Sequence, residues 1–322
     1  MHILVIRLSA LGDIVHSLPA LTDLRRHLPE AQIDFAVDER FVELAQMHSH
    51  VDRVISLPLK RWKRNLAKRS TWQELRQTLR MLRSAHYDHV IDLHGLNKSA
   101  IVAWLSRSPD RVGPAAAYCS EWLAPRLYHR YCNPSEAWLP VPRMRGVVAA
   151  ALGHTNPGPL DYGLTHTWAG RASGEVVLIH STSASAKLWP EEHWITIGRQ
   201  LIAQGMTPVL PWGSDSEKER SVRLAQAMGT AALVPPRRTI SQWAQVISRS
   251  ALVVGVDTGL THLAAAAGVP CLAIFAATGS ELFAPQNPDL AIALGGRGQA
   301  AALQAVQDSI ESLRTASQAE PA

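Results

Sequence analysis

Four short segments carry side chains that could do chemistry, and each follows an apolar run that predicts a β-strand. They are Ser9-Ala-Leu-Gly-Asp13, His180-Ser-Thr-Ser-Ala-Ser-Ala-Lys187, Pro211-Trp-Gly-Ser-Asp-Ser-Glu217 and Asp257-Thr-Gly-Leu-Thr-His262. In open parallel α/β sheets, ligands bind beyond the carboxyl ends of the strands. We therefore expect these four segments to form the functional site, and three of them lie in the second half of the chain.

Asp13 lies where the first predicted strand has ended and a helix begins. The partial positive charge of a helix N-terminus stabilises an ionised carboxylate, which keeps that carboxylate ready to act as a general base. The alternative is that Asp13 only caps the helix, which is the commoner role of such a residue.

Two segments of the second half suit a phosphate ligand. Asp257-Thr-Gly259 follows the apolar run 252–256 and opens a helix, so that glycine would let the backbone approach a ligand and the free helix amides could bind an anion. Lys187 ends a segment with four hydroxyl side chains in 181–185, and hydroxyls with a point charge suit a diphosphate. The alternatives are that Asp257 caps the helix and that the Lys187 segment is a solvated loop.

The densest run of charge is Lys60-Arg-Trp-Lys-Arg64, followed by Lys68 and Arg69. Because it follows a strand end and contains Trp62, we expect an anion-docking loop, with a solvated face as the alternative. Residues 1–150 hold 21 Lys and Arg against 14 Asp and Glu, whereas the whole chain holds 32 against 27. The positive first half favours an anionic partner, which could be a nucleic acid, an anionic lipid or an acidic small molecule.

Several classes of site are missing from the sequence. It has no G-x-x-x-x-G-K-[ST] motif and no strict G-x-G-x-x-G motif, which disfavours a P-loop ATPase and an NAD enzyme. It has no G-x-S-x-G elbow and no D-x-D motif. Pairs among its 14 histidines, such as His48 with His50 and His86 with His89, lack Cys or carboxylate partners at metal-ligand spacing. We therefore expect no metal site.

The elements that must position these segments alternate in type. Apolar runs at 2–8, 33–37, 51–57 and 89–93 predict strands, and helical spacing over 14–27, 71–84 and 98–106 predicts helices. The alternation returns with strands at 175–180, 207–210, 252–256 and 270–275 and helices at 190–204, 214–228, 241–248 and 262–267. Residues 109–159 show weak periodicity and end in the turn-rich 155–159. We expect two α/β domains with doubly wound parallel sheets, 1–157 and 158–322.

Length and composition agree with this organisation. The 322 residues are 47% hydrophobic and 18% charged, which is enough for two domains with sizeable cores and excludes a disordered chain. Three cysteines give no disulfide framework and indicate a reducing compartment. The first residues resemble a strand rather than a signal peptide, and the longest apolar stretch, 263–277, is broken by Gly268 and Pro270. We expect a cytoplasmic protein that could touch a membrane surface.

The segment Ser9-Ala-Leu-Gly-Asp-Ile-Val-His-Ser-Leu-Pro-Ala20 resembles the N-terminal signature of the bacterial lipopolysaccharide heptosyltransferases. Lys187-Leu-Trp-Pro-Glu-Glu-His-Trp194, Pro211-Trp-Gly213 and Val256-Asp-Thr-Gly-Leu-Thr-His262 follow at matching intervals, and the similarity extends over nearly the whole chain. These motifs favour the type I enzymes of that family over type II.

The resemblance implies an inverting glycosyltransferase of GT-B architecture, in which two Rossmann-like domains face each other across a cleft. It implies transfer of L-glycero-D-manno-heptose from ADP-heptose to the first Kdo of Kdo2-lipid A in lipopolysaccharide inner-core biosynthesis. The N-terminal domain would bind the acceptor and the C-terminal domain the donor. One alternative is a type II or related enzyme that uses a heptosylated acceptor, and a remote one is a non-catalytic nucleotide- or polyanion-binding protein.

The resemblance also assigns roles to residues. Asp13 would be the general base that deprotonates the acceptor hydroxyl, and Lys187 would stabilise the leaving group. The donor-binding residues would be Thr182, Ser183 and Lys187 on the diphosphate, Glu217 on the ribose or adenine side, and Asp257, Thr258, Gly259 and His262, with Asp257 on the heptose. The acceptor-binding residues would be Lys60, Arg61, Lys63 and Arg64.

For partners and location, the resemblance implies ADP-heptose and Kdo2-lipid A, with no nucleic acid, no metal and no other cofactor. It further implies a monomer, peripheral on the cytoplasmic face of the inner membrane.

Overall fold

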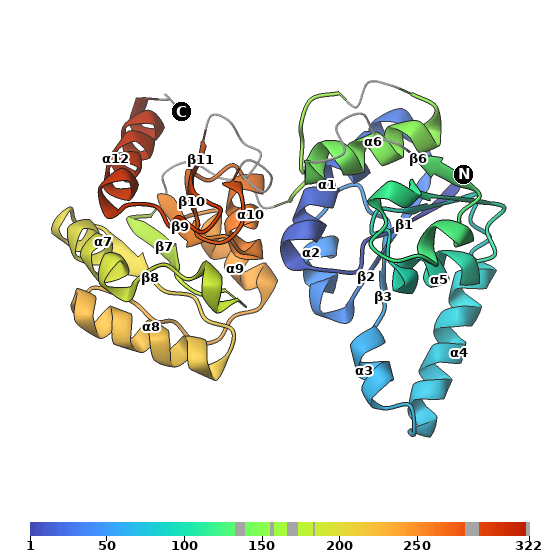
Figure 1. Ribbon diagram of the computed structural model, residues 1–322, viewed down its shortest axis with the longest axis horizontal. Helices are drawn as coiled ribbons and strands as arrows, with labels where there is room; N and C mark the ends of the chain where they lie inside the picture. Colours follow the sequence, from blue (N-terminus) through green and yellow to red (C-terminus); the bar gives the residue numbers. More distant parts are fainter. Residues whose placement is uncertain (133–138, 155–157, 166–172, 183, 281–289, 320–322) are drawn as a thin grey trace. The chain divides into compact units, whose positions relative to one another are not determined.

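The computed structural model describes residues 1–132, 139–154, 158–165, 173–182, 184–280 and 290–319. The chain divides into two compact units, Met1–Thr165 and His166–Ala322. Each unit contains a parallel sheet with helices on its faces (Figure 1).

The sheet of the first unit has the strand order β3-β2-β1-β4-β5-β6. The strands are β1 (His2–Ile6), β2 (Gln32–Val37), β3 (Arg53–Ser56), β4 (His89–Asp92), β5 (Asp110–Pro114) and β6 (Arg130–Cys132). The central strand β1 is a run of apolar residues and pairs in parallel with β2 and β4. Such a run is typical of a strand covered on both faces.

Helices cover both faces of this sheet. On one face, α3 (Leu59–Arg64), α4 (Arg69–Ser84) and α5 (Asn97–Leu105) bury Trp62, Leu82 and Val102 against strand residues such as Leu4. On the other face, α1 (Leu11–His27) packs against α6 (Pro140–Leu152) (Figure 1). The remaining helical segments are η1 (Glu39–Phe41), α2 (Val42–Gln46), η2 (Ala116–Tyr118) and η3 (Ala124–Leu127).

The sheet of the second unit has the order β11-β10-β9-β7-β8. Its strands are β7 (Glu175–Ile179), β8 (Thr207–Val209), β9 (Leu252–Val256), β10 (Cys271–Phe275) and β11 (Ala291–Gly295), with the short helical turn η4 (Ser185–Lys187) after β7. All the pairs are parallel, so the carboxyl ends of β10, β9, β7 and β8 lie in sequence along one edge.

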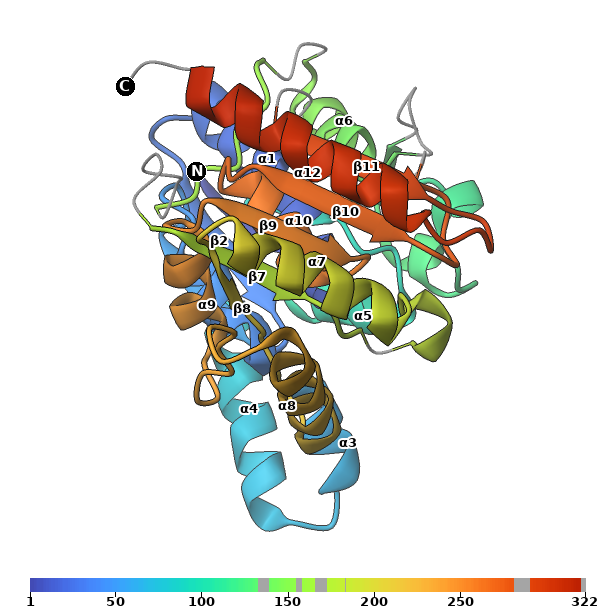
Figure 2. The same cartoon turned by 90° about the vertical axis from the view of Figure 1, so that its left-hand side faces the viewer.

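Helices α7 (Glu191–Ala203), α8 (Asp215–Met228) and α12 (Leu303–Ala319) cover one face of this sheet (Figure 2). They bury a core that includes Trp194, Leu224 and Ile310. Helices α9 (Ile240–Ile247) and α10 (Gly259–Ala266) lie on the other face. A side chain at Gly255 would collide with that of Thr261, whose hydroxyl donates to the Val256 carbonyl at 2.7 Å. The missing side chain thus lets α10 start directly at the end of β9.

The predicted fold class is confirmed, but residues 109–159 are more regular than expected. They contain β5, β6 and α6. Pro140 begins α6 and Gly153 ends it with a φ of 74°, and both residues are typical at those positions. Val141, Met144 and Val147 are buried at helical spacing. The weak periodicity of the sequence therefore does not mean that this region lacks regular elements.

The structure differs from the sequence-based expectations in three further respects. The run Lys60 to Arg64 lies on helix α3 and not in a loop, and β11 and α12 were not predicted. Residues 158–165, which we expected to begin the second domain, belong to the first unit. They are tied to it by Ser49 N–H donating to Gly163 O at 2.8 Å and Thr165 N–H donating to Met47 O at 2.9 Å. The turn 155–157 lies outside the described residues.

Among the described residues, we find no helix with both the length and the apolar character needed to cross a membrane.

Candidate active site

In the second unit, the carboxyl edge of the sheet brings together residues that lie far apart in the sequence. Thr182 and Lys187 follow β7, Asp257 follows β9 and Thr278 follows β10, while His262 lies on α10. Because β10, β9 and β7 are neighbours in the sheet, these side chains meet. All of these residues except Thr278 were predicted from the sequence to be site residues.

Asp257 is the centre of this cluster. Lys187 Nζ donates to its Oδ2 at 2.6 Å, Thr278 Oγ1 donates to the same oxygen at 2.5 Å, and His262 Nε2 lies 3.3 Å from Oδ1. Burial opposes ionisation of Asp257, but the hydrogen bonds from His262, Lys187 and Thr278 outweigh it and hold the pKa well below its usual range. The carboxylate is therefore ionised, and it holds Lys187 at the carboxyl edge of the sheet.

The start of α10 adds hydrogen-bond donors beside Lys187. The N–H groups in the first turn of a helix have no intrahelical acceptor, and Thr258 and Gly259 lie at this start. Thr182 Oγ1 donates to the Asp257 carbonyl at 3.4 Å, so its hydroxyl lies next to the same turn. An ammonium, a hydroxyl and free amides together can bind a diphosphate. Ser183 lies outside the described residues.

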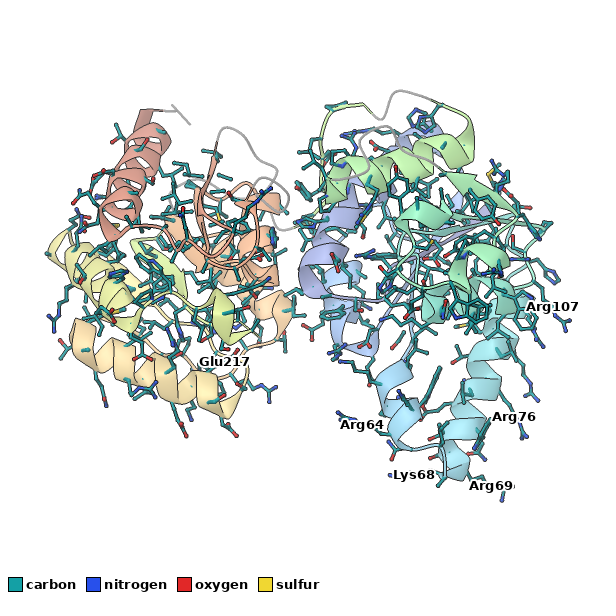
Figure 3. All side chains as sticks on the ribbon, viewed as in Figure 1. Arg64, Lys68, Arg69, Arg76, Arg107 and Glu217 are labelled. Atoms are coloured by element: carbon teal, nitrogen blue, oxygen red, sulfur yellow. The ribbon has the colours of Figure 1, made fainter. Side chains whose placement is uncertain are left out.

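Glu217, labelled in Figure 3, is placed by a helix cap. Its Oε2 accepts hydrogen bonds from the N–H groups of Gly213 at 2.7 Å and Ser214 at 2.8 Å, and the Ser214 hydroxyl accepts from the Glu217 N–H. The spacing Ser214-x-x-Glu217 is the capping-box pattern, a signal that the sequence analysis did not use. Any ligand contact of Glu217 therefore falls mainly to Oε1.

In the first unit, Asp13 lies in the first turn of α1 beside the end of β1. Its Oδ2 accepts from the Ala10 N–H at 2.9 Å and forms an ion pair with Arg7 Nη2 at 2.9 Å. Arg7 is buried and also donates from Nη1 to the Leu93 carbonyl at 2.7 Å. The Asp13 side chain is 39% exposed, and its Oδ1 makes no hydrogen bond to the part of the chain that is described.

The surroundings of Asp13 keep it ionised. Burial raises its pKa, but the charge of Arg7, the Ala10 N–H and the nearby His16 more than offset burial, and the pKa lies below the ordinary value. An ionised carboxylate on a partly exposed side chain that lines a pocket can accept a proton from a substrate hydroxyl.

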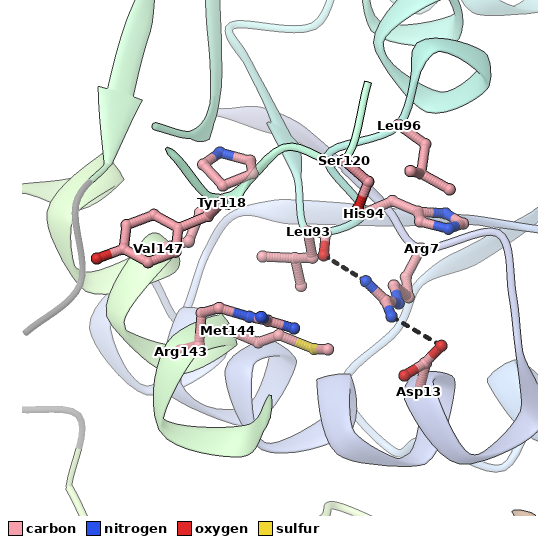
Figure 4. Close-up of a pocket in the computed structure, with 11 residues that line it drawn as sticks. Arg7, Asp13, Leu93, His94, Leu96, Tyr118, Ser120, Arg143, Met144 and Val147 are labelled. Carbon is pink, nitrogen blue, oxygen red and sulfur yellow. Dashed lines mark hydrogen bonds and ion pairs between the residues drawn. The ribbon is translucent and has the colours of Figure 1, made fainter. Parts of the chain in front are cut away.

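A pocket of about 240 Å³ opens in front of Asp13 (Figure 4). Its polar wall contains Arg7, His94 and Arg143, and Tyr118 and Ser120 also line it. Burial, together with Arg7 and Lys98, lowers the pKa of His94 to about 3, so this histidine is neutral. The Leu8 N–H donates to His94 Nδ1 at 3.2 Å, which leaves the proton on Nε2. The pocket thus offers two guanidinium groups and one imidazole N–H beside a carboxylate.

Sequence reasoning missed Arg7 and Arg143. Arg143 lies on α6, the helix that was not predicted, and Arg145 two residues on anchors this helix by an ion pair with the buried Asp23 of α1 at 2.6 Å. Arg7 ends the first apolar run and received no role. Two cations around a carboxylate suit a substrate that is itself an acid.

The four predicted acceptor-binding residues, Lys60, Arg61, Lys63 and Arg64, lie on α3 and are exposed. None of them is among the residues that line the Asp13 pocket. Arg61 is already paired, with Glu39 and with Glu74, each at 3.0 Å. For Lys60, Lys63 and Arg64 we find no ion pair within the described ranges. Arg61 therefore differs from Lys60, Lys63 and Arg64 in that its charge is already offset by carboxylates.

Within the residues that the structure describes, no group of three or more His, Cys, Asp or Glu side chains is arranged to hold a metal ion.

Two parallel-sheet α/β units, each with polar site residues at the carboxyl edge of its sheet, form an architecture of the GT-B type. The model of Glycosyltransferase family 9 (heptosyltransferase) matches residues 75–312. The chain belongs to this family.

Individual relatives match over nearly the whole chain. Lipopolysaccharide heptosyltransferase 1 of Pseudomonas aeruginosa is 37% identical over 303 residues, which are 92% of this chain and 82% of that protein. Lipopolysaccharide heptosyltransferase 2 of Escherichia coli is 26% identical over 314 residues, 90% of this chain and 84% of that protein.

Solved structures of E. coli heptosyltransferase WaaC are also similar to this chain. The structure with ADP has a TM-score of 0.89 at 30% identity and covers 97% of this chain and 100% of that chain. The structure with ADP-2-deoxy-2-fluoro heptose has a TM-score of 0.86 at 30% identity and covers 97% and 99%.

Proposed function

We propose that this glycosyltransferase moves L-glycero-D-manno-heptose from ADP-heptose to the first Kdo of Kdo2-lipid A, a step of lipopolysaccharide inner-core biosynthesis. The observation that carries the proposal is the 30% identity, over 97% of the chain, to an enzyme solved with a fluorinated ADP-heptose. The identity of 37% to a relative called heptosyltransferase 1, against 26% to one called heptosyltransferase 2, favours the unheptosylated acceptor.

The second unit would bind the donor. Its diphosphate would contact Thr182, Ser183, Lys187 and the amides of Thr258 and Gly259, while Oε1 of Glu217 would face the ribose or adenine. Asp257 and His262 complete this site. Because both oxygens of Asp257 already accept contacts from the protein, we propose that Asp257 first of all positions Lys187. Its contact with the heptose, implied by the family resemblance, remains a prediction.

The first unit would supply the base. Oδ1 of Asp13 takes the proton of the acceptor hydroxyl. The hydroxyl oxygen forms a bond to the anomeric carbon of the heptose, and the bond from this carbon to the diphosphate breaks. Attack opposite the leaving group inverts the anomeric configuration. The negative charge that develops on the departing ADP is stabilised by Lys187 and the first amides of α10, and no metal is required.

The acceptor would be held by cations. Arg7 and Arg143 face the pocket in front of Asp13, where a carboxylate next to the reacting hydroxyl could bind. Lys60, Arg61, Lys63 and Arg64 would face more distant phosphates and carboxylates of the lipid. We propose a monomer, peripheral on the cytoplasmic face of the inner membrane, that has no nucleic-acid partner.

Product analysis tests this function. The protein is incubated with ADP-heptose and either Kdo2-lipid A or its heptosylated form, and each lipid is analysed by mass spectrometry. The proposal predicts a gain of one heptose on Kdo2-lipid A. A gain only on the heptosylated lipid would favour a type II enzyme, and no gain on either, with strong salt-dependent binding to any polyanion, would favour a non-catalytic binding protein.

A further inference from the structure

Residues 59–84 form a positively charged hairpin, which we call the basic arm. It consists of α3, a short turn and α4, and it extends away from the sheet of the first unit (Figures 1 and 2). It contains nine Lys and Arg residues and a single acidic residue, Glu74, whereas the whole chain has a net charge of only +5. The rest of the chain holds 23 Lys and Arg against 26 Asp and Glu, so the net positive charge of this protein comes from the arm.

The tip of the basic arm presents apolar side chains among these charges. Leu66 and Trp72 are each 51% exposed. Trp72 Nε1 donates to the Leu66 carbonyl at 2.8 Å, and Thr71 Oγ1 donates to the Asn65 carbonyl at 2.8 Å, so the turn has a fixed shape. Lys68 and Arg69 project from the same turn (Figure 3).

Behind the tip lies an apolar groove of about 610 Å³ between α3, α4 and α5. Its lining is almost entirely apolar and includes Trp62, Trp72, Leu75 and Ile101, while Arg76 and Lys98 are its charged members. Leu82 and Val102 at its floor belong to the core of the unit. An open apolar surface of this kind marks a binding site more often than a solvated face.

Charge and apolar surface together select the partner. A polyanion such as a nucleic acid would satisfy the cations but would leave Leu66 and the groove in water. A surface of anionic lipids satisfies both, because Lys and Arg contact the headgroups while Trp and Leu enter the boundary with the acyl chains. We propose that the basic arm docks this protein on an anionic bilayer, with Leu66 and Trp72 in the headgroup region and the groove covered by lipid chains.

This surface is connected to Asp13, the proposed general base. This connection rests on the proposed function, because a lipid acceptor requires access to a membrane. Lys98 lines the groove, and its Nζ donates to Ser9 Oγ at 3.0 Å. Ser9 directly precedes Ala10, whose N–H binds Asp13. Docking by the arm would therefore bring the carboxylate close to lipids in the bilayer.

Co-sedimentation of the full-length protein with vesicles tests the proposal. The vesicles are phosphatidylethanolamine with phosphatidylglycerol, or phosphatidylcholine alone, and contain no acceptor lipid. We expect binding to the anionic vesicles that weakens at high salt. Lys68→Gln combined with Arg69→Gln should weaken the partition roughly tenfold or more, and Leu66→Ser should weaken it several-fold. The matched control is Arg237→Gln with Arg249→Gln, two exposed arginines of the second unit whose loss should change the partition little.

Four outcomes would overturn the proposal, and the first three concern the vesicles. They are equal binding to both kinds of vesicle, equal binding of the control and the arm variants, and no binding to either kind unless Kdo2-lipid A is added to the vesicles, which would assign the groove to the acceptor's own acyl chain. A dimer that Leu66→Ser dissociates, without vesicle binding, would assign the surface to a second copy.

Heptose transfer to a deacylated, water-soluble Kdo2 acceptor is measured in parallel. The arm variants should keep the wild-type rate in this assay within about twofold. If wild type transfers nothing to the soluble acceptor and nothing to Kdo2-lipid A, the proposed function fails, whereas the vesicle result stands independently.

Discussion

Arg7 Nη2 lies 2.9 Å from Oδ2 of Asp13, and it leaves Oδ1 of that carboxylate free to face the pocket. One buried guanidinium thus fixes the orientation of the proposed base and keeps it ionised. The same contact lowers the affinity of the carboxylate for a proton. Asp13 is therefore a weak base that is already ionised when the substrate binds.

The first prediction concerns the pH dependence of transfer. Because Arg7 lowers the pKa of Asp13, protonation of the base should abolish kcat/KM only below the ordinary carboxyl value of about 3.9. Arg7→Met removes the positive charge, so the pKa of Asp13 should rise and the acid limb should move to higher pH. Arg7→Lys keeps a charge and should keep the limb near its wild-type position. Circular dichroism verifies that both variants fold. An acid limb at an unchanged pH in Arg7→Met would show that the limb does not report protonation of Asp13.

The second prediction concerns Lys187 and Asp257. Loss of the ammonium in Lys187→Ala should lower kcat by roughly 10² to 10³, because charge grows on the leaving diphosphate. Asp257→Asn releases Lys187 from its 2.6 Å contact and should weaken binding of ADP and of ADP-heptose by similar factors, measured by calorimetry. A loss confined to ADP-heptose would show instead that Asp257 contacts the sugar.

The third prediction separates the cations of α3. Arg64→Ala should raise the acceptor KM about two- to fivefold and flatten its salt dependence, since we find no ion pair for Arg64 in the described chain. Arg61→Ala should have a smaller effect because Glu39 and Glu74 already offset its charge. Steady-state kinetics with a water-soluble acceptor at two salt concentrations measure both variants. Equal effects would mean that the acceptor displaces these carboxylates.

The fourth prediction concerns metals. If Lys187 and the amides of Thr258 and Gly259 stabilise the leaving group by themselves, transfer should continue at its normal rate in excess EDTA. A loss of activity in EDTA that Mg²⁺ restores would contradict this account of leaving-group stabilisation.

The sequence predicts those elements whose residues alone determine them. The uninterrupted apolar runs of β1 and β9 and the amphipathic spacing of α4 identify these elements and, with the βα alternation, the fold class. Helix α6 was missed because Pro140 and Pro142 at its start resemble loop residues, although proline is well tolerated in the first turn of a helix.

The site residues likewise fall into those that local sequence predicts and those that it does not. Asp13, Lys187 and Asp257 could be selected because each follows a strand, where parallel sheets bind ligands. Arg143 and Thr278 could not, because only the packing of α6 against α1 and the order of the strands bring them to Asp13 and Asp257. The ion pairs of Arg61 depend on where α3 meets α4 and η1, which no local pattern reveals.

Asp13 is proposed to remove the proton from the acceptor hydroxyl, and the rate of a single turnover in Asp13→Asn measures this step. With enzyme in excess over ADP-heptose and with saturating Kdo2 acceptor, we expect the chemical step to be slowed by roughly 10² to 10⁴, the usual contribution of a positioned base. Binding of ADP should be unchanged, because its proposed contacts lie in the second unit. A single-turnover rate near that of the wild type would reduce Asp13 to a residue of the helix start and would contradict the mechanism.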